Sequence, residues 1–164
     1  MKKHLIVLFA IFVSAQAMAQ TSKFTFPFQG GNQVMGKYFQ ENTEIPSTIK
    51  ESRAIGTVIL KFTADESGNV SKIVLYHADD ASLLQPLIDV LKKSEHKWII
   101  PDHEKEHDFI IPFSISFNPA GDAGDSAKKL YKSYQSRSPM STNDQMPLAE
   151  ITLLPAVEIS YTAN

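Results

Sequence analysis

The chain has 164 residues, which is enough for one domain and little more, and its formal net charge is −2. It contains no cysteine, so disulfides, thiolate chemistry and acylation at a lipoprotein cysteine are excluded. Its balance is slightly acidic and no dense basic stripe is present, which argues against nucleic-acid binding.

The N-terminus has the three parts of a cleavable signal peptide: a positive pair at Lys2 and Lys3, nine apolar residues from 5 to 13, and a small-x-small site at Ala17 and Ala19. The apolar run is well short of the ~20 residues that span a bilayer. We therefore expect a signal peptide over residues 1–19, a mature chain that begins at Gln20, and a periplasmic protein without a membrane anchor.

The following pattern predicts two short helices. An extended segment over residues 24–28 and a turn over 29–32 precede a helix over 33–42, whose inner face we expect to carry Val34, Met35 and Tyr38. Pro46 favours a new helical start, so a second helix is expected over 48–53.

Residues 57–63 alternate as a half-buried strand does, with Val58, Leu60 and Phe62 on one face. Residues 65–69 form a hairpin loop in which Gly68 allows a positive φ, and 70–77 is the returning strand. A leucine-rich helix is expected over 84–95, and Trp98 after it is predicted to be buried in the core.

Residues 109–117 alternate without a break and form the strongest predicted strand. The order of elements predicts an α+β domain over residues 24–118, with a small antiparallel three-stranded sheet and helices packed on one face. Residues 119–147 are rich in polar residues and are expected to be a flexible linker. Residues 148–164 form an apolar tail and a possible extra strand.

One motif suggests catalysis. Residues 103–107 read His-Glu-Lys-Glu-His and match the H-E-x-x-H pattern, which in zinc peptidases needs a helix that puts both imidazoles on one face. Pro101 and the strand that follows leave no room for a buried helix, so we interpret the stretch as a polar loop. We expect no enzyme activity, no metal site and no cofactor; a small zinc hydrolase built on His103 and His107 is a minor alternative.

An ordered set of motifs resembles the C-terminal domain of the TonB family, in the form frequent in Bacteroidetes. The matching segments are Phe28-Gln29-Gly30-Gly31, Tyr38-Phe39-Gln40-Glu41-Asn42, Ile45-Pro46, the strand from Gly56 to Phe62, the loop from Asp65 to Val70, Trp98-Ile99-Ile100-Pro101, and Phe113-Ser114-Ile115-Ser116-Phe117. They cover roughly residues 26–118. Gln29 replaces the proline of the family's first turn, Ile45 replaces a tyrosine, and one residue is inserted before Pro101.

The resemblance implies a protein-binding module for TonB-dependent outer-membrane transport. Members of that family capture an extended peptide, the TonB box of a receptor, by adding it as a strand to a sheet edge. The receiving edge is the last strand, here the alternating residues Phe109, Ile111, Phe113, Ile115 and Phe117. Pro112 removes one hydrogen-bond donor along it. From its sequence we expect neither the membrane helix nor the long proline-rich arm of an energy transducer.

The tail carries a further expectation. Residues 148–156 have the acidic-Thr-apolar pattern of a TonB box, so the tail either packs as an extra strand on its own domain or pairs with a sheet edge and competes with outside ligands. The main alternative function is an exported scaffold or homodimerisation domain with the same fold and no transport role.

Overall fold

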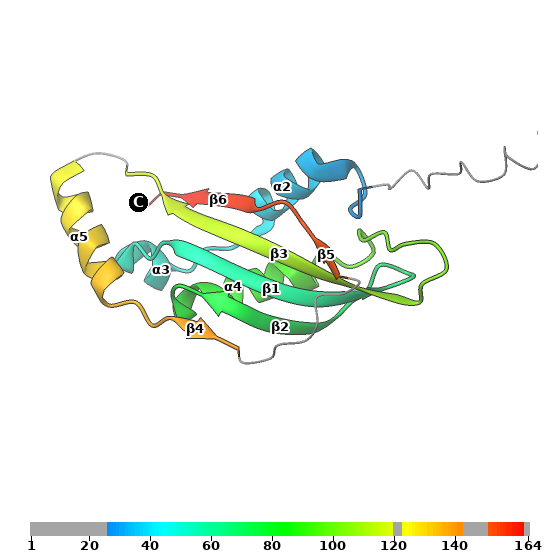
Figure 1. Ribbon diagram of the computed structural model, residues 1–164. Helices are drawn as coiled ribbons and strands as arrows, with labels where there is room; N and C mark the ends of the chain where they lie inside the picture. The colour runs from blue at the N-terminus through cyan, green and yellow to red at the C-terminus, as the bar shows by residue number, and fades with distance from the viewer. Residues whose placement is uncertain (1–25, 120–122, 143–150, 163–164) are drawn as a thin grey trace, which may run out of the picture.

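The two strands predicted on either side of the 65–69 loop form the centre of the sheet. The computed structural model describes residues 26–119, 123–142 and 151–162 (Figure 1). The elements in these ranges are α2 (Gly31–Asn42), α3 (Ser47–Ser52), β1 (Gly56–Asp65), β2 (Val70–Ala78), the 3-10 helix η2 (Ala81–Leu83), α4 (Leu84–Lys92), β3 (Glu106–Phe117), α5 (Ala123–Gln135), β4 (Met140–Ser141), β5 (Ile151–Leu153) and β6 (Val157–Tyr161).

The α+β class is confirmed, but the sheet has six strands rather than the predicted three. The strand order is β4-β2-β1-β3-β5, and β6 also pairs with β3. β1, β2 and β3 form the expected antiparallel meander, and β4 adds two antiparallel pairs to β2. β5 and β6 pair with β3 in parallel, so the sheet is only mostly antiparallel.

The hairpin loop between β1 and β2 is held by Asp65. Its Oδ1 accepts the backbone N–H groups of Ser67 and Asn69 at 2.9 and 2.8 Å, and Gly68 adopts a φ of 77°. Hydrogen bonds from the side chain and backbone of Asn69 hold the pKa of the Asp65 carboxyl below its ordinary value. The loop thereby sets the register in which Val58, Leu60 and Phe62 all face the core, each fully buried as predicted.

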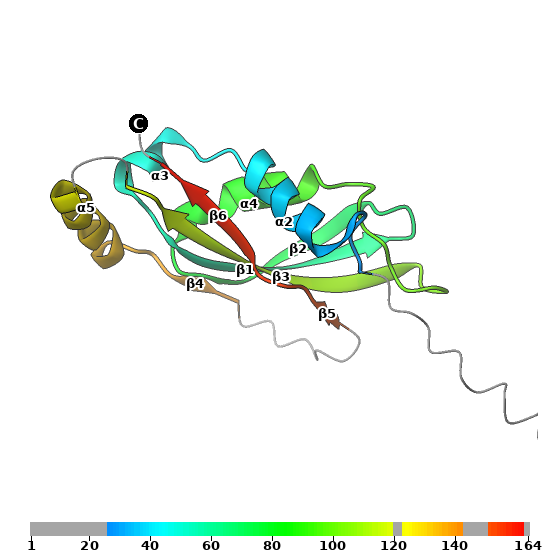
Figure 2. The ribbon, with the colours of Figure 1, turned by 90° about the horizontal axis from the view of Figure 1, so that it is seen from above.

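Helices α2, α3 and α4 lie on one side of the sheet, and α5 lies at its end (Figure 2). The expected inner face of α2 is wrong in part: Val34 is 48% exposed, whereas Met35 and Phe39 are buried. The prediction chose a stripe that begins one residue too early, and Phe39 fills the core instead.

The expected linker over 119–147 contains helix α5. Ser126 and Ser133 are buried and Leu130 lies partly exposed between them, so the inner stripe of α5 holds a single large apolar residue. Tyr131 and Tyr134 face outward. The helix is polar in overall composition and rich in Ser and Lys, which explains why the sequence suggested a linker.

Aromatic rings fill the space between the helices and the sheet. Trp98 is 3% exposed, as predicted, and its indole N–H donates to the hydroxyl of buried Ser94 at 2.9 Å. Its ring lies 4.5 Å from Phe62 and 5.1 Å from Phe28, measured between centroids. Trp98 therefore connects the chain entering α2 with the central strand.

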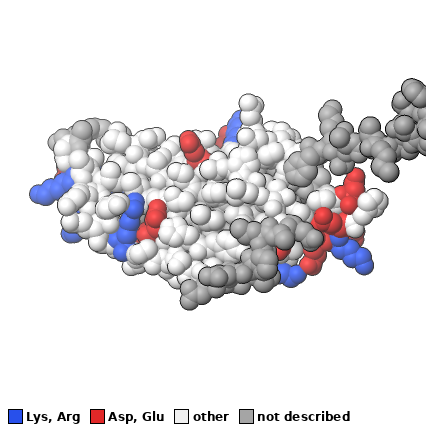
Figure 3. Space-filling model, in the orientation of Figure 1, with Lys and Arg blue, Asp and Glu red and all other residues white. Residues whose placement is uncertain are grey.

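Charged side chains of both signs are interspersed on the view of Figure 3, and its middle is largely uncharged. None of the helices in the described parts of the chain is both long and apolar enough to cross a membrane. The signal peptide predicted over residues 1–19 lies outside the described residues.

We predict that Gly68→Ala destabilises the protein by about 1–3 kcal/mol. An added Cβ would lie 2.9 Å from the carbonyl oxygen of Trp98, and the positive φ disfavours an L side chain. Gly36→Ala in the middle of α2 is the matched control: its Cβ would meet no atom within 4 Å, so it should stabilise by about 0.5–1 kcal/mol. Urea unfolding of both variants measures the difference, and a Gly68→Ala protein as stable as the wild type would contradict this account.

Candidate functional site

The predicted partner-binding residues do not lie on a free edge, because β3 is an interior strand of the sheet. Phe109, Ile111 and Phe113 are fully buried, Ile115 is 4% exposed, and Phe117 is partly buried. Their side chains form the core, and the other side of the β3 backbone is paired with β5 and β6. The expectation of an open receiving edge is therefore corrected: the chain's own C-terminal segment occupies it.

Residues 151–161 lie within the apolar tail predicted over 148–164, and from here on the name tail refers to them alone. They run parallel to β3 in two ladders. β5 pairs with residues 108–110, and β6 pairs with residues 113–117, from Phe113 opposite Val157 to Phe117 opposite Tyr161. The backbone N–H of Leu154 donates to the carbonyl of Ile110, and the N–H of Asn118 donates to the carbonyl of Tyr161, both at 2.8 Å. The tail thus satisfies the outward-facing backbone of β3 along most of its length.

The gap between the two ladders falls at Pro112. The carbonyl of Ile110 and the N–H of Asn118 both face the tail, and residues two apart in a strand present their backbone groups to the same side. Pro112 is on that same side and has no N–H to give. β5 ends opposite Ile110 and β6 begins opposite Phe113, so the missing donor coincides with the break between them.

Side chains of the tail alternate between core and solvent. Val157, Ile159 and Tyr161 are at most 6% exposed, whereas Glu158 and Ser160 between them face outward. The hydroxyl of Tyr161 donates to the carbonyls of Ala54 at 2.8 Å and Ile49 at 3.3 Å. Burial raises the pKa of this phenol to about 12, so it stays protonated and donating at neutral pH.

His107 connects the loop before β3 to the tail. Its side chain is 8% exposed, its Nδ1 lies 2.7 Å from Glu104 Oε2, and its Nε2 lies 2.8 Å from Thr152 Oγ1. An ionised carboxylate only accepts, so in the neutral ring Nδ1 carries the hydrogen and Nε2 accepts from the threonine hydroxyl. Both ring nitrogens of His107 therefore already have partners.

The H-E-x-x-H stretch is not helical. His103 lies in a loop with a φ of 74°, beside a polar hollow of about 590 Å³, and the strand β3 begins at Glu106 and contains His107. The two imidazoles are therefore not on one helix face, which the zinc-peptidase arrangement requires. In the described ranges no three His, Asp or Glu side chains come together as a metal site.

An ion pair between a buried lysine and a partly buried aspartate lies on the face of the sheet opposite the aromatic core, where the β5 ladder begins. Lys61 Nζ lies 2.7 Å from Asp108 Oδ2, and the hydroxyl of Thr63 donates to Asp108 Oδ1 at 2.5 Å. Burial raises the pKa of Asp108, but the hydrogen bonds from Lys61 and Thr63 outweigh it and hold that pKa below its ordinary value. Asp108 is paired with Ile151, so the cluster adjoins the start of the tail.

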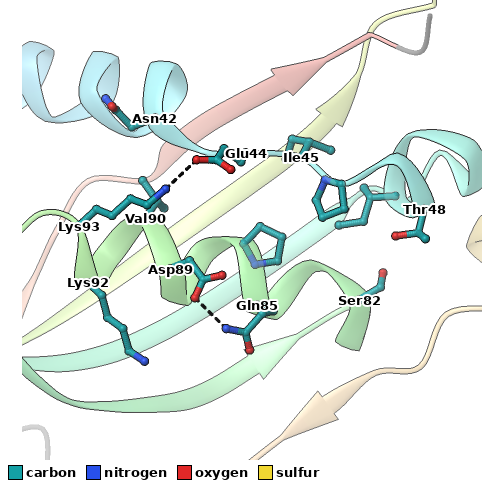
Figure 4. Close-up of a pocket in the computed structure, with 13 residues that line it drawn as sticks. Asn42, Glu44, Ile45, Thr48, Ser82, Gln85, Asp89, Val90, Lys92 and Lys93 are labelled. Carbon is teal, nitrogen blue, oxygen red and sulfur yellow. Dashed lines mark hydrogen bonds and ion pairs between the residues drawn. The ribbon is translucent and has the colours of Figure 1, made fainter.

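A second hollow, a groove of about 560 Å³, separates α4 from the α2–α3 connection (Figure 4). Its apolar lining includes Ile45 and Val90. Glu44 accepts from Lys93 at 2.7 Å and Asp89 accepts from Gln85 at 2.8 Å, so both of its carboxylates already have partners. The groove presents no convergent set of free donors or acceptors, and we assign it no ligand.

The tail was expected either to pack as an extra strand on its own domain or to pair with a sheet edge, and its residues 151–153 and 157–161 do form strands on β3 of the same chain. The alternation of Val157, Ile159 and Tyr161 signals a strand, but alternation does not identify the strand with which it pairs.

Compared with known proteins, the chain matches no family model, no curated protein and no solved structure.

We predict that Asp108→Asn lowers the free energy of unfolding by about 1–3 kcal/mol, because it leaves the Lys61 ammonium, whose side chain is 9% exposed, without a carboxylate. Glu106→Gln is the matched control. Glu106 lies two residues before Asp108 in β3, and the substitution breaks its exposed ion pair with Lys72, which should cost about 0–1 kcal/mol. Chemical denaturation of the two variants measures both values.

The pH dependence of the same variant gives a second readout. The pKa of Asp108 is lower in the folded chain, so its contribution to stability is present above the pKa of an unfolded aspartate, about 3.9, and is lost as the pH falls through the folded value. The stability difference between wild type and Asp108→Asn should shrink below pH ~4. A difference that stays constant down to acid unfolding would contradict this role.

Proposed function

We propose that the protein is a periplasmic binding module, similar to the TonB C-terminal domain, that accepts an extended peptide by strand addition and has no catalytic role. The observation that supports this proposal is the tail ladder: the outward-facing backbone of β3 already holds an extended segment in parallel, with alternate side chains buried. Strand addition draws affinity from backbone hydrogen bonds and selectivity from pockets for alternate side chains, and the tail makes contacts of both kinds on β3.

The proposed partner is the TonB-box type of segment in outer-membrane receptors, so the proposed role is accessory to TonB-dependent transport. This part of the proposal rests on the resemblance of residues 26–118 to that family. We infer export from the predicted signal peptide over residues 1–19.

A second candidate, an exported dimerisation domain, is favoured by the opposite edge of the sheet. β4 pairs only with His77 and Ala78, so on the side of β2 away from β1, residues 70–75 have no neighbouring strand among the described residues. Lys72 has a φ of 48° there and the pairing register shifts nearby, and such irregularities and charges discourage edge-to-edge pairing. We therefore rank dimerisation through β2 below peptide binding at β3.

The binding proposal predicts that the mature chain, residues 20–164, binds a synthetic TonB-box peptide saturably, whereas a scrambled peptide of equal composition does not bind. In ¹H–¹⁵N NMR spectra, the amide shifts should concentrate in β3 and the tail. Perturbations concentrated in residues 70–75, or a stable homodimer by sedimentation that ignores the peptide, would favour the dimerisation alternative instead.

The export proposal predicts that the protein recovered from a periplasmic fraction begins at Gln20. Mass spectrometry of the intact protein measures this directly. An Ala19→Arg variant, which places a large charged residue at the small-residue cleavage position, should accumulate with its first 19 residues attached. Wild-type protein found only uncleaved and in the cytoplasmic fraction would overturn the proposed location.

A further inference from the structure

We propose that the tail, residues 151–161, is a displaceable intramolecular ligand of β3, so that an outside peptide binds only when the tail leaves. This inference rests on the proposed function and names the regulation of that same site. It also specifies the ligand: an extended segment that runs parallel to β3 and whose last five residues carry apolar side chains at every second position, the last of them aromatic.

The first argument is topological. The antiparallel meander of β1, β2 and β3 has continuous pairing of its own, with ten residue pairs between β1 and β3 running from Gly56–Ile115 to Asp65–Glu106. The tail joins this meander only along the far side of β3 and in the opposite sense to β1. Before reaching β5, the chain passes through β4 on the other edge of the sheet (Figure 1). The tail can therefore detach without breaking any pair of the meander.

The second argument is the match between the tail and a bound peptide. Backbone hydrogen bonds at Leu154 and at Tyr161 fix its direction, and Leu154 and the three alternate side chains of β6 enter the core. The position of Tyr161 is the most selective, because two backbone carbonyls, those of Ile49 and Ala54, receive its hydroxyl. A ligand without a donor at that position removes the hydrogen bond to the Ala54 carbonyl, whereas the Ile49 carbonyl still accepts from the N–H of Ala54 and the hydroxyl of Ser52.

The third argument is energetic. The tail is covalently attached, so it competes for β3 at an effective concentration on the order of millimolar. A free peptide with the same contacts reaches β3 only in proportion to the fraction of molecules whose tail is released. Loosening the tail should therefore raise the apparent affinity of an outside peptide even though no contact with that peptide changes.

A disulfide lock gives the sharpest test, because the chain has no cysteine of its own. Ser114 and Glu158 are directly paired between β3 and β6, and both side chains are exposed. In the full chain carrying Ser114→Cys and Glu158→Cys, oxidation should join the tail to β3, as mass spectrometry can verify. The probe is a fluorescent synthetic peptide of residues 151–162, with fluorescence anisotropy as the readout.

We expect the reduced protein to bind the probe and the oxidised protein to bind at least tenfold more weakly. Equal binding by the oxidised and reduced forms would overturn the inference, since the probe would then bind elsewhere. A probe carrying alanine in place of Tyr161 should bind the reduced protein at least tenfold more weakly than the parent probe, and equal binding would remove the ligand specificity inferred above.

A second variant checks the result without cysteines. Ile159→Ser weakens a buried contact of the tail and should bind the probe at least tenfold more tightly than the wild type, whereas Glu158→Gln, an exposed neighbour, should match the wild type. Circular dichroism establishes that each variant is folded. If Ile159→Ser does not fold, the disulfide pair alone decides, because its two exposed positions leave the core unchanged.

The same proteins separate this inference from the proposed function. Binding of the tail probe but of no TonB-box peptide would keep the intramolecular ligand and reject the transport partner. Binding of TonB-box peptides equally to the locked and unlocked proteins would keep a peptide-binding function and reject the tail as its regulator.

Discussion

The backbone of β3 must be hydrogen-bonded on both sides, and this requirement organises the whole sheet. On one side β1 pairs with it from Glu106 to Ile115; on the other, the tail supplies partners from residue 108 to residue 118. The aromatic side chains of β3 supply much of the core between these neighbours and the helices. An unpaired β3 would expose a row of donors and acceptors to water or to another chain. The tail keeps that strand paired within one molecule.

The meander was accessible from the sequence because its signals are local. The two-residue alternation of Val58, Leu60 and Phe62, and the Asp65–Asn69 loop with Gly68, specify a strand, a turn and a register without reference to anything distant. Trp98 was placed in the core correctly for the same kind of reason, as a large apolar ring that directly follows an amphipathic helix. These features fix the class of the fold.

Only part of the candidate site could be predicted from the sequence. The strand β3 could be predicted, but its pairing with the tail depends on residues far away in the chain. The alternation in β3 indicates a strand and a buried face, but it does not say what lies beside the backbone. The tail also has the alternating pattern of a strand. However, no local sequence pattern indicates that it pairs in parallel with a strand about forty residues earlier in the chain. Helix α5 was also not predicted, because its composition is polar and one large aliphatic residue, Leu130, lies between the buried Ser126 and Ser133. In each case tertiary contacts outweighed local preference.

Pro112 divides the contact between β3 and the tail into two short ladders, of three and five residue pairs. Pro155 in the tail lies at the same break. A continuous ladder of eight pairs would have to open cooperatively, whereas two ladders separated by prolines can open one after the other. In the exchange proposed above, an incoming strand would pair first with residues 113–117 while β5 still holds the tail on residues 108–110. The exchange proposed above would therefore break one ladder at a time rather than all eight pairs at once.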